Sequence, residues 1–206
     1  MAYEFNGSNQ YLSSTHPVSA APFTMSAWAK LNNSSGNRGI ISIGNASTNH
    51  RYILYMSTSF LLFYVQDSSG YNQISYYGIS ENTWYHCCAV MESSSSRKLY
   101  INGINVSSST LTMSPVGIDS LYIGAIHSSG VDGFMNGQIA DAAVWNAALT
   151  EDEIKSLADG MTSDQIRPQN LAFHAPLIRN LNDTANGLTI VNNNSASVFN
   201  HMRIYA

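Results

Sequence analysis

The chain is poor in charge, cysteine and proline. Of its 206 residues, nine are Lys or Arg and thirteen are Asp or Glu, so charged residues make up 11% and the formal net charge is −4. No stretch gathers several basic side chains, and binding to nucleic acid through its phosphates needs such a cluster. We therefore expect no nucleic-acid partner. Polarity comes instead from 30 Ser, 21 Asn and 11 Thr residues.

Long apolar runs are missing as well. The longest, at 53–56 and 60–65, are far shorter than the ~18 residues that cross a bilayer as a helix. Residues 1–5 lack the basic start and the apolar stretch of a secretory signal. We therefore expect cytosolic synthesis without a signal peptide, no membrane partner and, from the length, a single domain over residues 1–206.

The two cysteines are neighbours in a strand-like run. Adjacent strand residues point to opposite faces, so a disulfide between Cys87 and Cys88 is geometrically disfavoured. Cysteine is also among the residue types that are most often buried. We expect two reduced packing thiols here, and favour them over a metal or redox pair.

A period of two dominates the chain and predicts half-buried antiparallel strands. In residues 23–31 the apolar side chains fall on odd positions, whereas Trp28 and Lys30 fall on the even, polar face. About a dozen such runs with almost no helix indicate an all-β chain that forms a two-sheet antiparallel β-sandwich of the jelly-roll type. The other strand-like runs are residues 38–43, 52–57, 60–66, 73–77, 84–91, 98–101, 104–106, 121–126, 138–145, 171–176 and 197–205.

Two local signals mark a tight turn and the one helix. Asn102-Gly103 between apolar residues is typical of a two-residue hairpin turn, because both residues tolerate positive φ angles. Thr150 and Glu153 have the spacing of a capping box, in which each side chain bonds to the backbone of the other. This pattern predicts one short helix near residues 150–159, which Gly160 ends.

Several segments resemble the concanavalin A-like, laminin G-like jelly-roll family. FTMSAWAK at 23–30 resembles the family's second-strand motif. WYHCCAV at 84–90 is similar to its Trp-x-His-Val-Ala-Val strand, with cysteines in place of aliphatic residues. The resemblance spans residues 3–160 and implies two antiparallel sheets of six or seven strands, with the first and last strands adjacent. The other matching segments are YEFNGS at 3–8, KLYING at 98–103, LYIG at 121–124, NGQIAD at 136–141 and WNAALT at 145–150.

The end of the chain resembles a narrower group. LAFHAPL at 171–177 and a closing strand at 198–205 are similar to the ends of stand-alone laminin G-like proteins found among tailed-phage virion genes. That resemblance implies a non-enzymatic structural or interaction protein of the virion, such as a capsid decoration protein or a tail-associated part. The partners it implies are other virion proteins, or further copies of this chain in a homo-oligomer.

Signals for catalysis are weak. Glucanases of this fold use two carboxylates on one strand face, and no strand-like run here has that pattern. The acidic run Glu151, Asp152 and Glu153 begins the predicted helix, where the helix dipole favours negative charge. His86 stands where the family motif has a histidine, and we interpret it as structural. We expect no enzymatic activity, and a glucanase is only the third hypothesis.

No cofactor is predicted. Several relatives bind Ca²⁺ at one end of the sandwich, and the weak candidate ligands in this chain are Asp119 and Asp132. Calcium takes six to eight oxygen ligands, several of them carboxylates. These two loops supply few carboxylates, so a solvated loop is favoured over a Ca²⁺ site.

Aromatic side chains are the best candidates for binding. Trp28, on the polar strand face, could stack on a sugar or a partner protein, although packing is the favoured interpretation. The tyrosines between positions 52 and 77 are denser than a core requires, and Tyr is enriched at interfaces. They support a second hypothesis, a carbohydrate-binding, lectin-like adhesion module that holds glycans. These tyrosines are Tyr52, Tyr55, Tyr64, Tyr71, Tyr76 and Tyr77.

Overall fold

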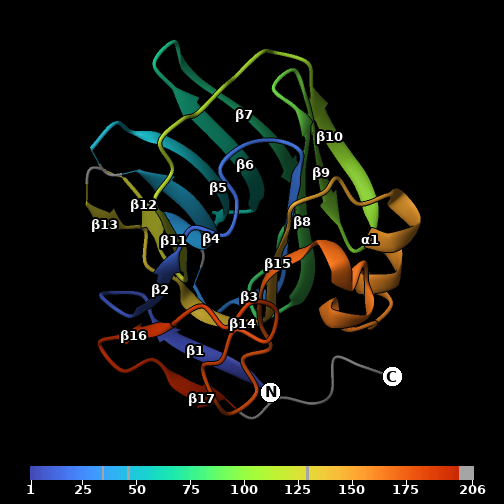
Figure 1. Ribbon diagram of the computed structural model, residues 1–206. Helices are drawn as coiled ribbons and strands as arrows, with labels where there is room; N and C mark the ends of the chain where they lie inside the picture. Colours follow the sequence, from blue (N-terminus) through green and yellow to red (C-terminus); the bar gives the residue numbers. More distant parts are fainter. Residues whose placement is uncertain (34, 46, 129, 200–206) are drawn as a thin grey trace.

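The computed structural model describes residues 1–33, 35–45, 47–128 and 130–199. Two antiparallel sheets pack face to face as a β-sandwich, and one α-helix covers the outer side of one sheet (Figure 1). The predicted all-β fold with one short helix is therefore confirmed. Within the described residues, no helix is long and apolar enough to cross a membrane.

Sheet A contains eight strands. Their order is β10-β9-β8-β3-β14-β1-β17, and β15 also pairs with β14. The first strand therefore lies beside the last one described, as the resemblance implies. The strands are β1 (Ala2–Asn6), β3 (Phe23–Leu31), β8 (Trp84–Ser93), β9 (Ser96–Ile101), β10 (Ile104–Ser109), β14 (Asn136–Trp145), β15 (Leu171–Ala175) and β17 (Ser197–Phe199).

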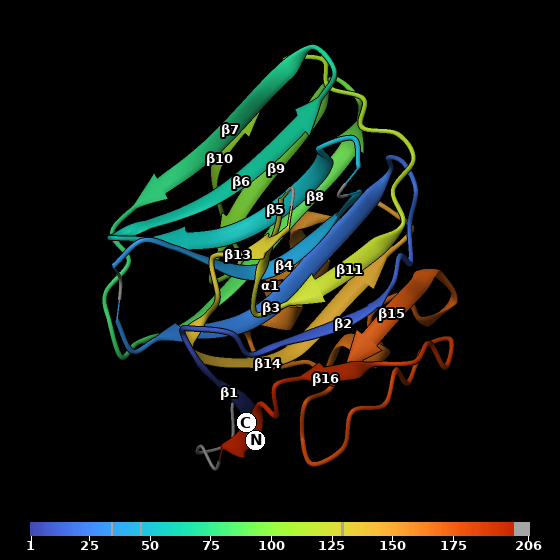
Figure 2. The same ribbon diagram turned by 90° about the vertical axis from the view of Figure 1, so that its left-hand side faces the viewer.

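Sheet B contains seven strands in the order β16-β2-β11-β4-β5-β6-β7. Figure 2 shows this sheet from its outer side, with a small extra hairpin, β12 (Ile126–His127) and β13 (Val131–Asp132), in front of it. The strands are β2 (Tyr11–Thr15), β4 (Asn37–Asn45), β5 (His50–Ser57), β6 (Phe60–Asp67), β7 (Gly70–Tyr77), β11 (Ser120–Ile123) and β16 (Val191–Asn193).

The core lies between the two sheets, and the alternation in β3 is as predicted. Met25, Ala27 and Ala29 face the core and are fully buried, whereas Trp28 and Lys30 are half-buried on the outer side. Cys87 lies in the same core, and Cys88 packs on the outer side beneath the helix. Both thiols are free and buried, and burial raises the pKa of each.

The helix and the tight hairpin follow their local signals. Helix α1 (Glu151–Ala158) begins after Thr150, whose hydroxyl accepts from the Glu153 backbone N–H while the Glu153 carboxylate accepts from the Thr150 backbone N–H. Ile154 and Leu157 pack with Trp145 against sheet A. Two short 3₁₀ helices, η1 (Ser163–Gln165) and η2 (Pro168–Asn170), lead from α1 into β15. The Asn102-Gly103 turn joins β9 to β10.

Two predicted strands have different limits. The run at 121–126 is broken because Gly124 adopts a φ of +81°, which turns the chain out of β11 and toward β12. The predicted closing strand at 197–205 begins as β17, and residues 200–205 lie outside the described residues.

Residues 171–199, which we call the C-terminal strap, add strands to both sheets. In sheet A, β15 pairs with β14 and β17 pairs with β1, whereas β16 pairs with β2 in sheet B. The strap runs along the lower edge of the sandwich in both views (Figures 1 and 2). It therefore holds the two sheets together at one edge.

Buried hydrogen bonds fix this strap. The His174 ring lies between Asp141 Oδ1, 2.7 Å from its Nε2, and Thr184 Oγ1, 2.7 Å from its Nδ1. Asp183 is 6% exposed, and its carboxylate accepts four backbone N–H groups. The donors are His174 at 2.8 Å, Ala185 at 3.0 Å, Asn186 at 3.1 Å and Leu188 at 2.8 Å.

Candidate functional site

The outer face of sheet B carries a small apolar cluster at its centre. Because successive strand residues alternate in direction, Ile53 and Tyr55 of β5 point away from the core. Their partners in register on β6 are Tyr64 and Leu62. These side chains pack with Ile126 of the β12–β13 hairpin. The hairpin therefore lies close against this face.

Small residues on β4 let the hairpin approach. A Cβ atom on Gly39 would lie 2.3 Å from the backbone carbonyl of Ala125, so only glycine fits there. The Gly39 backbone N–H donates to the Gly133 carbonyl at 2.8 Å. The Ser42 hydroxyl donates to the Ala125 carbonyl at 2.9 Å and accepts from the His127 N–H at 3.0 Å. The hairpin is thus fixed on the sheet by its backbone.

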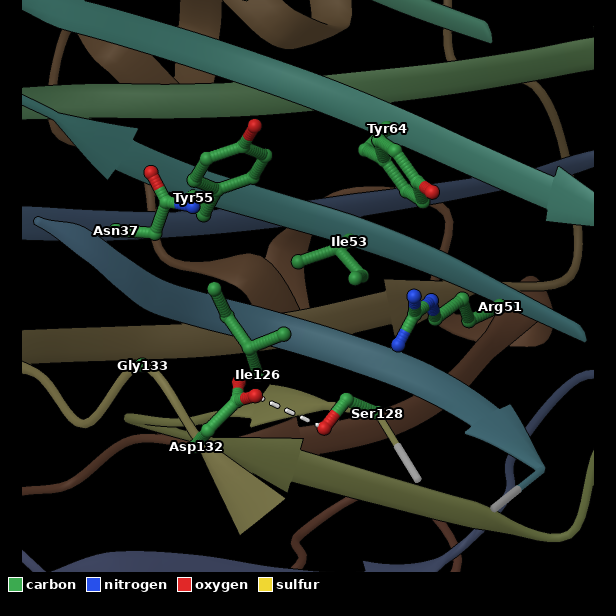
Figure 3. A pocket seen from close by; sticks show the side chains of 9 residues that line it. All are labelled: Asn37, Arg51, Ile53, Tyr55, Tyr64, Ile126, Ser128, Asp132 and Gly133. Carbon is green, nitrogen blue, oxygen red and sulfur yellow. Dashed lines mark hydrogen bonds between the residues drawn. The ribbon is translucent and has the colours of Figure 1, made fainter. Parts of the chain in front are cut away.

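A pocket of about 410 Å³ opens between the hairpin and strands β5 and β6. Figure 3 shows Tyr55 and Tyr64 on one side of Ile53, with the hairpin residues on the other and Arg51 at one end. The lining residues are Asn37, Arg51, Ile53, Tyr55, Tyr64, Ile126, Ser128, Asp132 and Gly133.

Hydrogen bonds hold the Arg51 guanidinium in the pocket wall. Its Nε donates to Gln66 Oε1 at 2.8 Å, and its Nη1 donates to the His127 carbonyl at 3.0 Å. The guanidinium carbon lies 5.6 Å from the Tyr64 ring centroid. Gln66 Oε1 also accepts from the Tyr64 hydroxyl at 3.0 Å, so one amide orients both side chains. In the described part of the chain, Arg51 forms no ion pair with a carboxylate.

The opposite wall is acidic and polar. Asp132 Oδ2 accepts from the Ser128 hydroxyl at 2.9 Å, and both residues line the pocket on the side of the hairpin (Figure 3). Ser128, Asp132, Arg51 and Asn37 supply hydrogen-bond donors and acceptors to the pocket. The aromatic and aliphatic lining residues are Ile53, Tyr55, Tyr64 and Ile126. Such a mixture can bind a small ligand that has both an apolar face and several hydroxyl groups.

The comparisons place the fold among known proteins. A family model described as the concanavalin A-like lectin/glucanases superfamily matches residues 6–155. The chain belongs to this superfamily. A search of curated proteins gives no match.

Solved structures of the superfamily fold have low sequence identity to this member. The Ruminococcus gnavus IT-sialidase CBM40 bound to α2,3-sialyllactose has a TM-score of 0.64 at 13% identity, covering 77% of this chain and 98% of its own. A heptameric SAP-like pentraxin of Limulus polyphemus has a TM-score of 0.67 at 19% identity, and the match covers 92% of this chain and 93% of the pentraxin chain. A proposed carbohydrate-binding protein of Bacteroides ovatus has a TM-score of 0.64 at 19% identity, and the match covers 95% of this chain and 60% of the Bacteroides chain.

In this superfamily member, four of the six predicted tyrosines share the outer face of sheet B. Tyr55 and Tyr64 line the pocket, and Tyr71 and Tyr77 lie farther along the same face on β7. The prediction was wrong for Tyr52, which is 3% exposed and lies in the core, where burial raises its pKa to about 12.

Strand parity explains that error and a second one. Tyr52 and Tyr55 are three residues apart on one strand, so they point to opposite faces. Tyr76 likewise faces inward with Ile74 and packs against the core. Neither Tyr52 nor Tyr76 can contribute to a binding surface on the outer face.

Trp28 lies apart from these tyrosines, on the outer side of sheet A. It is half-buried, and its ring centroid lies 5.5 Å from that of His86. His86 is buried, with Nε2 2.8 Å from the Ser26 hydroxyl. This geometry supports a packing role for Trp28 and a structural role for His86.

Lowering the pH from 7 to 4 is expected to destabilise the fold by roughly 3 kcal/mol through His86 alone. Burial lowers the pKa of His86 to about 4 from 6.5. Above pH 6.5 the His86 ring is neutral in both the folded and the unfolded chain. Below it the unfolded chain binds a proton that the folded chain excludes, so stability falls until about pH 4. Urea unfolding between pH 4 and 8 measures the slope of the unfolding free energy against pH. The wild type should show the slope that His86 causes, and His86→Gln should lose it. Equal slopes in the two proteins would contradict it.

The two Ca²⁺ candidates are not part of one cluster. Asp119 accepts from the Ser120 hydroxyl at 2.8 Å and from the Asn45 side-chain amide at 2.9 Å. Asp132 instead lines the pocket. Across residues 1–33, 35–45, 47–128 and 130–199, no three His, Cys, Asp or Glu side chains gather in a metal-binding group. A Ca²⁺ site stays a weak prediction.

Sequence reasoning missed Arg51, Asn37 and Ile126 as pocket residues. The available signal was the glycine content of β4, since Gly39 and Gly44 interrupt a strand that is otherwise suited to large side chains. A glycine inside a strand often marks a place where another segment of backbone approaches closely. That signal indicates a contact, although it does not identify the partner segment.

Proposed function

We propose that this protein is a non-catalytic carbohydrate-binding module whose ligand occupies the pocket between β5, β6 and the β12–β13 hairpin. The observation that carries the proposal is the convergence of the Tyr55 and Tyr64 rings with a fixed Arg51 guanidinium and the Asp132 carboxylate. A pyranose ring offers C–H groups to an aromatic face and hydroxyl groups to charged partners. The hydrogen-bonded walls are preorganised for such a ligand.

Two further observations support this proposal. Solved proteins with this fold include a sialidase module bound to sialyllactose. Hydrolysis of a glycosidic bond normally requires a pair of carboxylates on either side of it, and among the lining residues of the pocket only Asp132 is acidic. The pocket therefore favours binding over a glucanase activity.

A glycan array tests the proposal. Wild-type protein should bind a defined group of glycans, and Tyr64→Ala should lower the affinity at least about 10-fold, equivalent to about 1.4 kcal/mol. Ile104→Ala is the matched control, because Ile104 is 67% exposed on sheet A and its loss should leave binding unchanged. An array without signal, or equal binding by Tyr64→Ala, would contradict the proposal.

We also propose that this carbohydrate-binding module is located in a virion. It rests on the resemblance of residues 171–177 to the ends of phage virion proteins, and it would make the module a capsid decoration or tail-associated part that displays the pocket. Mass spectrometry of purified particles tests it. Particles that lack this chain would leave carbohydrate binding in place and remove the virion role.

A further inference from the structure

A second group of aromatic side chains lies beside the pocket on the outer face of sheet B. Phe60 is 39% exposed, Tyr71 is 64% exposed and Tyr77 is 70% exposed. With Tyr64, which also lines the pocket, they form what we call the aromatic row. The row lies on β6 and on β7, the edge strand of sheet B.

The row consists of two ring pairs across neighbouring strands. Tyr64 and Tyr71 are stacked, with centroids 5.3 Å apart and planes at 18°. Phe60 and Tyr77 pack edge to face at 5.2 Å. Phe60 and Tyr64 are four residues apart on β6, so the pairs are separated by ~13 Å along the strand. That span is longer than one pyranose ring, so a ligand that contacts both pairs must be a chain.

On β7 the positions between the two pairs are polar and uncharged, and on β6 the outward position between them is Leu62. Gln73 and Ser75 face outward on β7 and are exposed, in register with Tyr64 and Leu62 of β6. They offer hydrogen-bond donors and acceptors between the aromatic faces. Arg51 and Asp132 carry charge only at the pocket end. The row is therefore suited to neutral sugar units.

We propose that the pocket and the aromatic row together bind a single oligosaccharide chain. One end of the chain occupies the pocket, and the following neutral units lie over β6 and β7 toward Phe60 and Tyr77. This inference rests on the proposed function, because Tyr64 belongs to both parts of the site. It adds that affinity depends on chain length. The exposed rings thereby gain a role, since large apolar groups on an edge strand otherwise favour aggregation.

The experiment measures how the affinity of the protein depends on the length of the oligosaccharide. The probes are the di-, tetra- and hexasaccharides of cellulose, chitin and poly-N-acetyllactosamine, together with 3′-sialyllactose, on one array and by calorimetry for each series that binds. We expect the hexasaccharide of a binding series to bind at least 10-fold more tightly than its disaccharide. Phe60→Ala/Tyr77→Ala, which removes the ring pair away from the pocket, should abolish that gain while leaving disaccharide affinity unchanged, and Ile104→Ala should change neither.

The outcomes separate the two proposals. Tyr64-dependent binding with no gain from added units, or a gain that the double variant retains, overturns the chain-binding site and leaves the carbohydrate-binding function standing. No binding to any probe overturns both. If sedimentation instead shows self-association that the double variant abolishes while the chain-length dependence is unaltered, the row is an interface between copies, and the inference is wrong.

Discussion

Gly39→Ala is expected to abolish ligand binding in the pocket and to lower the melting temperature by roughly 6–12 °C, which corresponds to about 3 kcal/mol for a domain of this size. The added methyl group would lie 2.3 Å from the Ala125 carbonyl and 2.7 Å from the Ile126 backbone nitrogen. Backbone atoms cannot rotate away as a flexible side chain can. The β12–β13 hairpin must therefore move off β4.

That movement removes one wall of the pocket. The hydrogen bonds from Gly39 to Gly133 and from Ser42 to the hairpin lengthen together, and Ile126 loses its contact with the cluster on sheet B. Binding is lost although no side chain of the pocket has been changed. Differential scanning calorimetry and the glycan array measure the two effects.

Gly130→Ala is the matched control, because it places the same methyl group in the same hairpin connection. A Cβ atom at Gly130 meets no atom within 4 Å, so stability and binding should stay at wild-type levels. If Gly39→Ala behaved like Gly130→Ala, the close approach of hairpin and sheet would not define the pocket.

Asp183→Ala should have a comparable or larger effect on stability, a loss of about 4 kcal/mol and therefore roughly 8–16 °C in melting temperature. The carboxylate accepts four backbone N–H groups at 2.8–3.1 Å from a buried position. Hydrogen bonds to a charged acceptor are stronger than neutral ones. Alanine leaves the donors without their acceptor, and the C-terminal strap should exchange its amide hydrogens faster.

Two further variants make this prediction specific. Asp183→Asn keeps the shape of the side chain and one acceptor oxygen, so its melting temperature should lie between those of Asp183→Ala and the wild type. Asp164→Ala removes an exposed carboxylate from η1 and should change little. Calorimetry and hydrogen exchange of the strap read out all three, and a fully stable Asp183→Ala protein would show that other contacts hold the strap.

The parts of the fold that were predicted correctly depend on neighbours in the chain. The alternation in residues 23–31 gave the strand and its buried face, and Asn102-Gly103 gave the hairpin turn. Thr150 and Glu153 gave the start of the helix. In each case the residues that determine the structure lie within one strand, turn or helical turn, so a local pattern is sufficient.

The pocket was only partly predictable, because it depends on contacts between distant segments. Tyr55 and Tyr64 were identified from composition, whereas strand parity, which is local, would already have excluded Tyr52. Arg51 became a pocket residue because the His127 carbonyl, 76 positions away in the chain, accepts its hydrogen bond. Nothing near Arg51 in the sequence indicates that partner.

The pairing of β1 has a consequence for synthesis on the ribosome. Its two neighbours in sheet A are β14 (Asn136–Trp145) and β17 (Ser197–Phe199), so both edges of β1 are covered only after residues 197–199 have been synthesised. High contact order of this kind slows folding. We expect nascent chains arrested before residue 190 to be protease-sensitive and dependent on chaperones, whereas chains that include residues 197–199 form the resistant sandwich.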